Sequence, residues 1–392
     1  MFGNFVAALA RSPGISGVKI AIPSEMLEKV NRMVENDDKI EIKPFPIFVE
    51  VKRILGIPGT GRLQIALRKV TGRYTGQEGT LRKLSEDCDL LYCFWPHFFT
   101  FPDIEKPVIC TIQDTILFDF PEIIGAGATY AEWEKQRTWI TKCKKVVVSS
   151  DVSRLKVMEE FGVDSSKISV IRHDAVPDSK SMGNSDANEA LPSLPRNFFV
   201  YPSNLSPHKN HYNLLVAWSR FERRRDYPLV FFGGGSEILY FKGPQWDVNL
   251  NWQQLRLVGL IKRLGLKPGE DFHALGYVPD ELVLPIISRA TGLIMPSFAE
   301  GGGSYPVEEA LSVGVPVLCS DIPVMREHVG KRSAEIKWFD PYLPESIVRA
   351  VIDFLDDFKR VKESALRAMG DRRPTWEEIA AAYSAAFGEL IK

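Results

Sequence analysis

Two glutamates and a run of glycines lie close together in the second half of the chain, in an arrangement that suits phosphate. Glu300 stands directly before the glycines 301–303, and Glu308 follows eight positions after Glu300. Glycine lets the backbone come close to a ligand. Pro306 suits the first turn of a helix, whose free N–H groups and positive dipole end then face the glycines. The pattern predicts a diphosphate held between two carboxylates, one near each end of a sugar nucleotide.

The elements on both sides of this turn are also visible in the sequence. The apolar run Leu293–Met295 ends at Pro296 and predicts a short buried strand. A helix is expected over 306–313. A strand, a glycine turn and a helix in this order place the ligand at the carboxyl end of a parallel sheet, where open α/β folds bind nucleotides.

The spacing of the two glutamates around a glycine-rich turn resembles the signature of the family-4 retaining glycosyltransferases of the GT-B fold. The continuation VGVPVLCSDIPVMREHVG, residues 313–330, is similar to that family's helix end, strand and Asp-Ile-Pro loop. The resemblance implies an α/β fold of two Rossmann-like domains that face each other across a cleft. It implies metal-independent transfer of a hexose, with mannose as one option, from a nucleotide-diphosphate sugar to a saccharide or lipid-linked saccharide in polysaccharide biosynthesis.

The resemblance also assigns roles to individual residues. Glu300 would meet hydroxyls of the donor sugar near the reaction centre, and Glu308 would accept hydrogen bonds from the ribose hydroxyls. Lys209, at the start of a predicted helix, matches a lysine that grips the diphosphate. Glu308 has a structural alternative, in which Glu308 and Glu309 are a pair of acids that stabilise a helix N-terminus, although Glu309 alone could serve that purpose. No cofactor and no metal are implied, since GT-B enzymes use lysine and helix N-termini in place of an ion.

Two positions depart from the family pattern. Asn204 stands where relatives have an arginine, and Gln113 stands where many have a histidine. The lost charge at 204 either argues against fast turnover or means that another cation substitutes, and His208 and Arg326 are the candidates. These departures motivate an alternative from another class, a non-catalytic GT-B homologue that binds a nucleotide sugar or a partner enzyme.

The start of the chain departs from the pattern as well. It opens with FGNFVAALARS, which predicts a helix where the family has a strand and a glycine-rich loop. That strand is central in a Rossmann sheet, so its absence predicts a hole between its neighbours. Either ~15–30 residues precede the given start, by comparison with usual βα units, or the domain lacks the strand. We prefer the first interpretation.

Further candidates follow predicted strands in both halves. Asp114 either orients a hydroxyl or caps its loop, and His97 either lines the cleft or is packed structure. Trp95 and Phe101 either form an apolar face for a lipid or the membrane, together with the phenylalanines 98–99, or belong to the core. The residues predicted to bind the donor are Glu308, Gly301, Gly302, Gly303, Ser304, Asn204, Gly234, Tyr277 and Val278, and those predicted to act in catalysis are Glu300, Lys209 and Asp114.

Composition and charge agree with this interpretation. The 392 residues are too many for one ordinary core and predict about two domains. The net charge of −1 favours no nucleic acid partner, and no apolar run is long enough to cross a bilayer. Five cysteines without metal-ligand spacing predict reduced core residues. We expect a cytoplasmic protein that contacts the inner face of the membrane peripherally; its oligomeric state is left open.

Short apolar runs alternate with helical patterns, as in parallel α/β sheets. We predict an acceptor-side domain over 1–176, a linker over 177–195, a nucleotide-sugar domain over 196–374 and a final helix over 375–392 that returns to the first domain. Thr375 and Glu378 form a possible capping box for that helix. The predicted strands are Val18–Ile22, Leu90–Phe94, Val108–Ile112, Lys145–Ser149, Ile168–Ile171, Phe198–Tyr201, Leu229–Phe232, Asp271–Leu275, Gly292–Met295 and Val315–Leu318.

Overall fold

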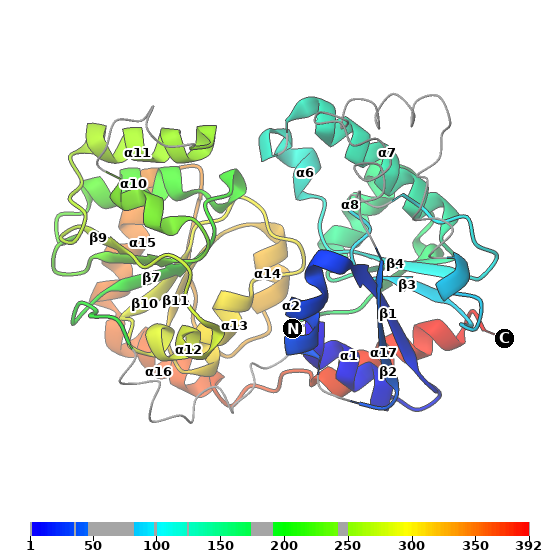
Figure 1. Cartoon of the computed structure of the whole chain (residues 1–392). Helices are drawn as coiled ribbons and strands as arrows, with labels where there is room; N and C mark the ends of the chain where they lie inside the picture. The colour runs from blue at the N-terminus through cyan, green and yellow to red at the C-terminus, as the bar shows by residue number, and fades with distance from the viewer. Residues whose placement is uncertain are drawn as a thin grey trace.

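The computed structural model describes residues 2–34, 37–45, 82–97, 100–123, 125–173, 191–241 and 250–391. Strands and helices alternate along the chain, and the strands within each sheet are parallel. Figure 1 shows two α/β domains side by side, with the C-terminal domain in green to orange and the N-terminal domain in blue to cyan. The predicted fold class, two Rossmann-like domains, is confirmed.

The C-terminal domain is built on one six-stranded sheet, in the order β12-β11-β10-β7-β8-β9. Four of its strands are fully buried along their length, as expected for a parallel sheet covered on both faces. The strands are β7 (Phe199–Pro202), β8 (Leu229–Phe232), β9 (Phe272–Ala274), β10 (Gly292–Met295), β11 (Val317–Ser320) and β12 (Lys337–Phe339).

Helices cover both faces of this sheet (Figure 1). Their apolar faces join the strands in one core that contains Trp218, Phe231 and Phe354. The helices are α10 (His211–Arg220), α11 (Trp252–Leu264), α12 (Asp280–Ser288), α13 (Tyr305–Ser312), α14 (Pro323–Val329), α15 (Pro344–Asp356) and α16 (Phe358–Ala368), and short 3₁₀ turns are η5 (Pro207–Lys209) and η6 (Ser236–Tyr240).

The described strands of the N-terminal domain fall into two separate sheets. One pairs β1 with β2, and the other has the order β3-β4-β5-β6. For the described residues, this interruption between the two sheets agrees with the hole that the sequence predicts between neighbouring strands. The strands are β1 (Val18–Pro23), β2 (Ile40–Phe45), β3 (Leu91–Cys93), β4 (Val108–Ile112), β5 (Lys145–Val148) and β6 (Ile168–Val170), and the helices are α1 (Phe2–Arg11), α2 (Leu27–Met33), α6 (Ile116–Asp119), α7 (Ala126–Lys142) and α8 (Asp151–Phe161).

The final helix α17 (Trp376–Gly388) packs on the N-terminal domain against α1, as Figure 1 shows in red beside blue. Tyr383 of α17 lies in the core of that domain, where its hydroxyl is 3.1 Å from Thr111 Oγ1 and its ring contacts Phe5. The predicted capping box is present, because Thr375 accepts from the Glu378 N–H and Glu378 accepts from the Thr375 N–H. The chain therefore crosses back between domains through residues 369–375.

All ten predicted strands are present, and β4, β8 and β10 have the predicted bounds. Two strands, β2 and β12, were missed. The predicted linker lies outside the described residues except for 191–195. No helix among the described parts of the chain is long and apolar enough to cross a membrane.

Candidate functional site

Lys209 and Glu300 meet at the carboxyl edge of the C-terminal sheet. Lys209 ends η5 in the loop after β7, and Glu300 follows β10, which is the neighbour of β7 in the sheet. The Lys209 Nζ atom lies 2.6 Å from Glu300 Oε1, and both side chains are largely buried. The structure thus brings together the two residues predicted for diphosphate and sugar contact. An ion pair at this place offers a donor to one ligand group and an acceptor to another.

Asn210 fixes the backbone that carries Lys209. It adopts the left-handed conformation with φ of 57°, which asparagine tolerates better than most residues. Its side chain caps α10 by accepting from the Asn213 N–H, and its amide donates to the Pro296 and Pro341 carbonyl oxygens at 2.8 Å each. Because Pro296 closes β10, this side chain links the two loops that bear the ion pair.

The two candidates for a substitute cation are both unsuitable, which corrects the sequence prediction. Burial lowers the pKa of His208 to about 3, with a smaller contribution from the Lys209 charge, so this imidazole is neutral at physiological pH. Arg326 donates twice to Asp321, at 2.7 and 2.8 Å, and its guanidinium stacks 4.0 Å from the centre of the Trp338 ring. Neither side chain adds free positive charge beside Lys209.

Glu308 lies on a face of α13 that is closed to ligands. Its side chain is 1% exposed and is held by two arginines. Arg332 Nε donates to Oε1 at 3.0 Å, and Arg373 Nε donates to Oε2 at 2.7 Å. His328 Nε2 lies 3.3 Å from Oε1. The carboxylate therefore belongs to a buried ionic cluster, and the predicted contact between Glu308 and a ribose is corrected here.

Glu309 stands on another face of the same helix. Burial, with a smaller contribution from the charge of Asp280, raises its pKa to about 7. Asp280 begins α12, directly after the loop 276–279, and α12 packs against α13. Its carboxylate has no hydrogen-bond or ion-pair partner among the residues that the structure describes. A half-buried carboxyl group without a partner is suited to accept hydroxyl groups of a ligand.

The N-terminus of α13 points toward the glycine turn. Ser304 is its N-cap residue, but no side-chain capping bond is made, and the buried Ser304 hydroxyl has no partner among the described residues. Gly303 has φ of +129°, a region that favours glycine, and a Cβ there would collide with the His328 ring. This hydroxyl and the positive dipole end of α13 lie where the sequence predicts the diphosphate.

Gly301 and Gly302 contact the N-terminal domain. A Cβ at Gly301 would collide with the Gln113 carbonyl oxygen, and one at Gly302 with the Ser149 hydroxyl. The glycines therefore permit a close approach of the two domains, which the sequence did not indicate. A cavity of about 100 Å³ lies at this junction, and both domains line it with Thr115, Ile116, Asp119, Val152, Ser153, Lys156, Phe298, Ala299, Glu300, Ile322, Pro323 and Val324.

Other predicted donor residues lie at the same edge of the sheet. Asn204 folds its side chain onto its own loop, where Oδ1 accepts from the Ser206 N–H at 3.1 Å. A Cβ at Gly234 would meet nothing within 4 Å, so there is room beside this loop. Tyr277 is 74% exposed, whereas Val278 is buried next to it. Ligand contacts of these residues stay predictions.

Comparison with known proteins agrees with this geometry. The model of the family "glycosyl transferases group 1" matches residues 185–368. The O-antigen chain mannosyltransferase B of Escherichia coli is 27% identical over 295 residues, which are 72% of this chain and 70% of that protein. The O-antigen chain mannosyltransferase RfbU of Salmonella typhimurium is 29% identical over 241 residues, which are 60% of this chain and 58% of that protein.

A solved structure extends the likeness over both domains. The Anabaena protein Alr3699/HepE, in complex with UDP and glucose, superposes with a TM-score of 0.65 at 12% identity, over 99% of this chain and 96% of that one. The C-terminal domain thus matches the group 1 glycosyltransferases, and the chain has the GT-B fold.

On the N-terminal side of the glycosyltransferase, the polar candidates have mainly structural contacts. Asp114 Oδ1 accepts from the Ile116 N–H at 3.0 Å and so caps its loop, although the residue lies against Gly301. His97 is buried. Its Nδ1 atom lies 2.8 Å from Gln136 Nε2 and 3.4 Å from Glu132 Oε1. The packed interpretation of His97 is thereby confirmed.

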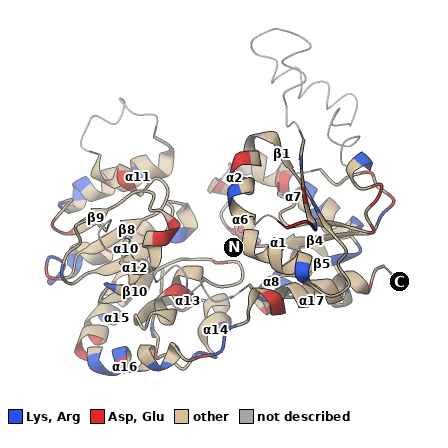
Figure 2. Cartoon of the chain, turned by 60° about the horizontal axis from the view of Figure 1, so that its bottom comes forward, with Lys and Arg blue, Asp and Glu red and all other residues tan. Residues whose placement is uncertain are grey.

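The aromatic residues that are candidates for a membrane face differ in how exposed they are. Trp95 is 44% exposed, and Phe101 packs edge-on against Trp139. Residues 98–99 lie outside the described parts of the chain. Lysines, arginines and acidic residues are interspersed over both domains (Figure 2). A membrane contact therefore stays a prediction.

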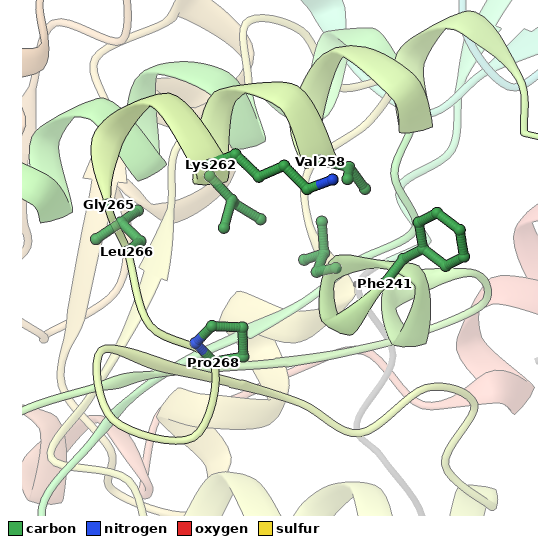
Figure 3. Close-up of a pocket in the computed structure, with 8 residues that line it drawn as sticks. Phe241, Val258, Lys262, Gly265, Leu266 and Pro268 are labelled. Carbon is green, nitrogen blue, oxygen red and sulfur yellow. The ribbon is translucent and has the colours of Figure 1, made fainter. Parts of the chain in front are cut away.

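An apolar cavity of about 290 Å³ lies away from the ion pair, between α11 and η6 (Figure 3). Its lining contains one charged side chain, that of Lys262, and none of the predicted site residues. It does not contribute to the candidate site of the glycosyltransferase.

Sequence reasoning missed three residues of this site. Asn210 has a recognisable signal, because asparagine before an apolar-periodic segment is a common N-cap. Glu309 was set aside as an acid that favours the helix start. Glu327, in α14, contacts the N-terminal domain and has no local signal, because its partners lie 155 to 176 residues earlier in the chain.

Proposed function

We propose that this group 1 glycosyltransferase transfers a hexose, with retention, from a nucleotide-diphosphate sugar to a saccharide or lipid-linked saccharide acceptor in polysaccharide biosynthesis. The Lys209–Glu300 pair carries the proposal, because it joins a cation and a carboxylate at the carboxyl edge of the donor sheet. The names of the two relatives favour mannose as the sugar. HepE, whose structure holds UDP and glucose, supports a nucleotide donor.

In the proposed reaction, the bond between the anomeric carbon and the β-phosphate oxygen breaks while the acceptor oxygen bonds to the same face of that carbon. The acceptor proton passes to the departing phosphate oxygen, so no histidine is required at position 113. Lys209 and the positive dipole end of α13 stabilise the charge that develops on the diphosphate. Glu300 accepts hydroxyl groups of the sugar and orients the ring. These groups would supply the electrostatic stabilisation without a metal or cofactor.

We assign the ribose contact to Glu309 in place of Glu308. Both hydroxyls of a ribose can donate to one carboxylate. Glu309 is the acid of α13 whose oxygens have no partner among the described residues, and Asp280, whose charge raises its pKa, directly follows the loop that contains Tyr277. That loop is where the sequence predicts the base, so the ribose would lie between the base and the diphosphate on α13.

The experiment begins with a thermal-shift screen of GDP-, UDP- and ADP-sugars, followed by transfer assays with the donor that stabilises the protein. Lys209→Met and Glu300→Gln should each lower turnover by about 10²- to 10³-fold, as removal of one transition-state contact does. Glu309→Ala should instead weaken nucleotide affinity by about tenfold, through loss of charge-assisted hydrogen bonds. Lys359→Met, which removes an exposed lysine of α16, is the matched control and should leave both quantities unchanged.

One observation favours the non-catalytic alternative. Asn204 brings no charge, and neither His208 nor Arg326 replaces the arginine of relatives. In that case the wild-type protein would bind a nucleotide sugar in the screen without releasing nucleoside diphosphate. Turnover that falls equally in Lys359→Met and Lys209→Met would also contradict the assigned site.

A further inference from the structure

The N-terminus of helix α8, in the N-terminal domain, is capped by a side chain from the other domain. Glu327 of α14 accepts from the Asp151 N–H at 2.8 Å and from the Val152 N–H at 3.0 Å, one bond to each carboxylate oxygen. Arg172, which follows β6 in the N-terminal domain, donates to Glu327 Oε1 at 2.6 Å. The carboxylate thus receives two free N–H groups of a helix start and one guanidinium, all from the opposite domain.

A second contact lies beside the first. The Ser153 hydroxyl donates to the Gly301 carbonyl oxygen at 2.8 Å, and the Ser150 hydroxyl lies 3.1 Å from the same oxygen. Ser150 is also the N-cap residue of α8 and accepts from the Ser153 N–H. The start of α8 therefore holds both α14 and the glycine turn of the C-terminal domain.

These contacts reach the proposed catalytic pair through the backbone. Gly301 directly follows Glu300, so a fixed Gly301 carbonyl restricts where the Glu300 side chain can lie. Ser153 and Glu300 line the same small cavity between the domains. Glu327 itself touches neither Lys209 nor Glu300 in any hydrogen bond or ion pair within the described residues. Its influence on them must pass through the domain contact.

We propose that Glu327 is a positioning residue, which holds the two domains closed on the start of α8 and thereby places Glu300 for the reaction. The proposal rests on the function proposed above for Glu300. It makes the closed arrangement depend on a carboxylate, because only an ionised group with two oxygens can accept both helix N–H groups and the Arg172 guanidinium. Loss of that charge leaves these donors without their acceptor, and the domains separate about the crossing segment 369–375.

The test compares Glu327→Gln and Arg172→Gln with Glu335→Gln. Glu335 pairs with Lys337 and Arg360 inside the C-terminal domain, so it is a matched glutamate that spans no domain contact. Small-angle X-ray scattering measures the radius of gyration, calorimetry measures nucleotide affinity, and a transfer assay measures kcat.

Glu327→Gln and Arg172→Gln should both show a larger radius of gyration. Their kcat should be lower by about 10- to 100-fold, because misplacement of the reacting groups slows the reaction. Their nucleotide affinity should change by no more than about twofold, because the nucleotide contacts are proposed within the C-terminal domain. Glu335→Gln should match the wild type in all three measurements.

Scattering of Glu327→Gln and Arg172→Gln identical to that of the wild type would overturn the proposal, as would a fall in kcat that Glu335→Gln shares. If Glu327→Gln does not fold, Arg172→Gln tests the same contact from the other domain. If the wild type transfers no sugar, the proposed function fails, whereas the scattering comparison still decides whether Glu327 closes the domains.

Discussion

Two neighbouring glutamates on helix α13 have opposite environments. Glu308 is surrounded by the guanidinium groups of Arg332 and Arg373 and belongs to the buried interior. Glu309, one residue later, has no partner among the described residues, and burial together with the charge of Asp280 raises its pKa to about 7. Consecutive residues on a helix point about 100° apart, so each carboxylate meets a different set of neighbours.

The contrast indicates that Glu308 stabilises the fold and that Glu309 is open to a ligand. A buried carboxylate with two arginines is already neutralised, and a ligand could reach it only by breaking those ion pairs. A buried carboxylate without a partner costs free energy when ionised, because burial disfavours the charged form. Such groups gather at functional sites, where the ligand supplies the missing donors.

The largest expected effect concerns stability. Glu308→Ala leaves two buried guanidinium groups without their carboxylate, and breaking a buried ion pair costs about 3–5 kcal/mol. We expect the free energy of unfolding to fall by that amount in urea denaturation. Glu309→Ala, the matched change one residue away, removes no ion pair among the described residues and should be far milder. Equal losses in the two variants would show that the faces of α13 do not differ as described.

A smaller effect follows from the pKa of Glu309. The folded-state pKa of about 7 lies above the ordinary glutamate value of 4.5, so folding favours the protonated group. The contribution to stability is full below about pH 4.5 and is lost as pH rises through about 7. Wild type should therefore lose about 3 kcal/mol relative to Glu309→Gln over this range, at about 1.4 kcal/mol for each pH unit between the two pKa values.

The measurement is the free energy of unfolding of both proteins in urea at a series of pH values. Glu309→Gln removes the titrating group while it keeps the size of the side chain. A constant difference between wild type and Glu309→Gln from pH 4 to 8 would contradict the raised pKa and the unpartnered state of the carboxyl group.

Much of the fold was predictable from the sequence because it depends on local patterns. The bounds of β8 and β10 follow from continuous apolar runs, and the start of α17 follows from its capping box. β12 was missed because it has only three residues at the edge of the sheet, and β2 because it alternates apolar with charged residues and contains Pro44.

The site was less predictable because its decisive contacts are distant in sequence. The pair Lys209 and Glu300 came from strand ends and a family pattern, although their direct ion pair did not. The roles of Glu308 and Glu309 could not be separated, since the arginines that close Glu308 lie 24 and 65 residues away. The contact of Gly301 with the N-terminal domain was likewise not predictable, because a run of glycines indicates that some group comes close to the backbone but does not identify that group.

The smallest expected effect separates the two causes of the raised pKa of Glu309. Burial is the larger cause and the charge of Asp280 is the smaller one. Asp280→Asn should therefore lower the pKa of Glu309 only part of the way toward 4.5, and the pH at which stability is lost should move down by a corresponding fraction, worth less than about 1 kcal/mol. Glu281→Gln, the next acid on α12, is exposed and should leave this pH unchanged. A return to the ordinary glutamate pKa in Asp280→Asn would mean that repulsion, and not burial, sets the environment of Glu309. The face that we assign to the ribose would then be open to water, and it would no longer contrast with the closed face of Glu308.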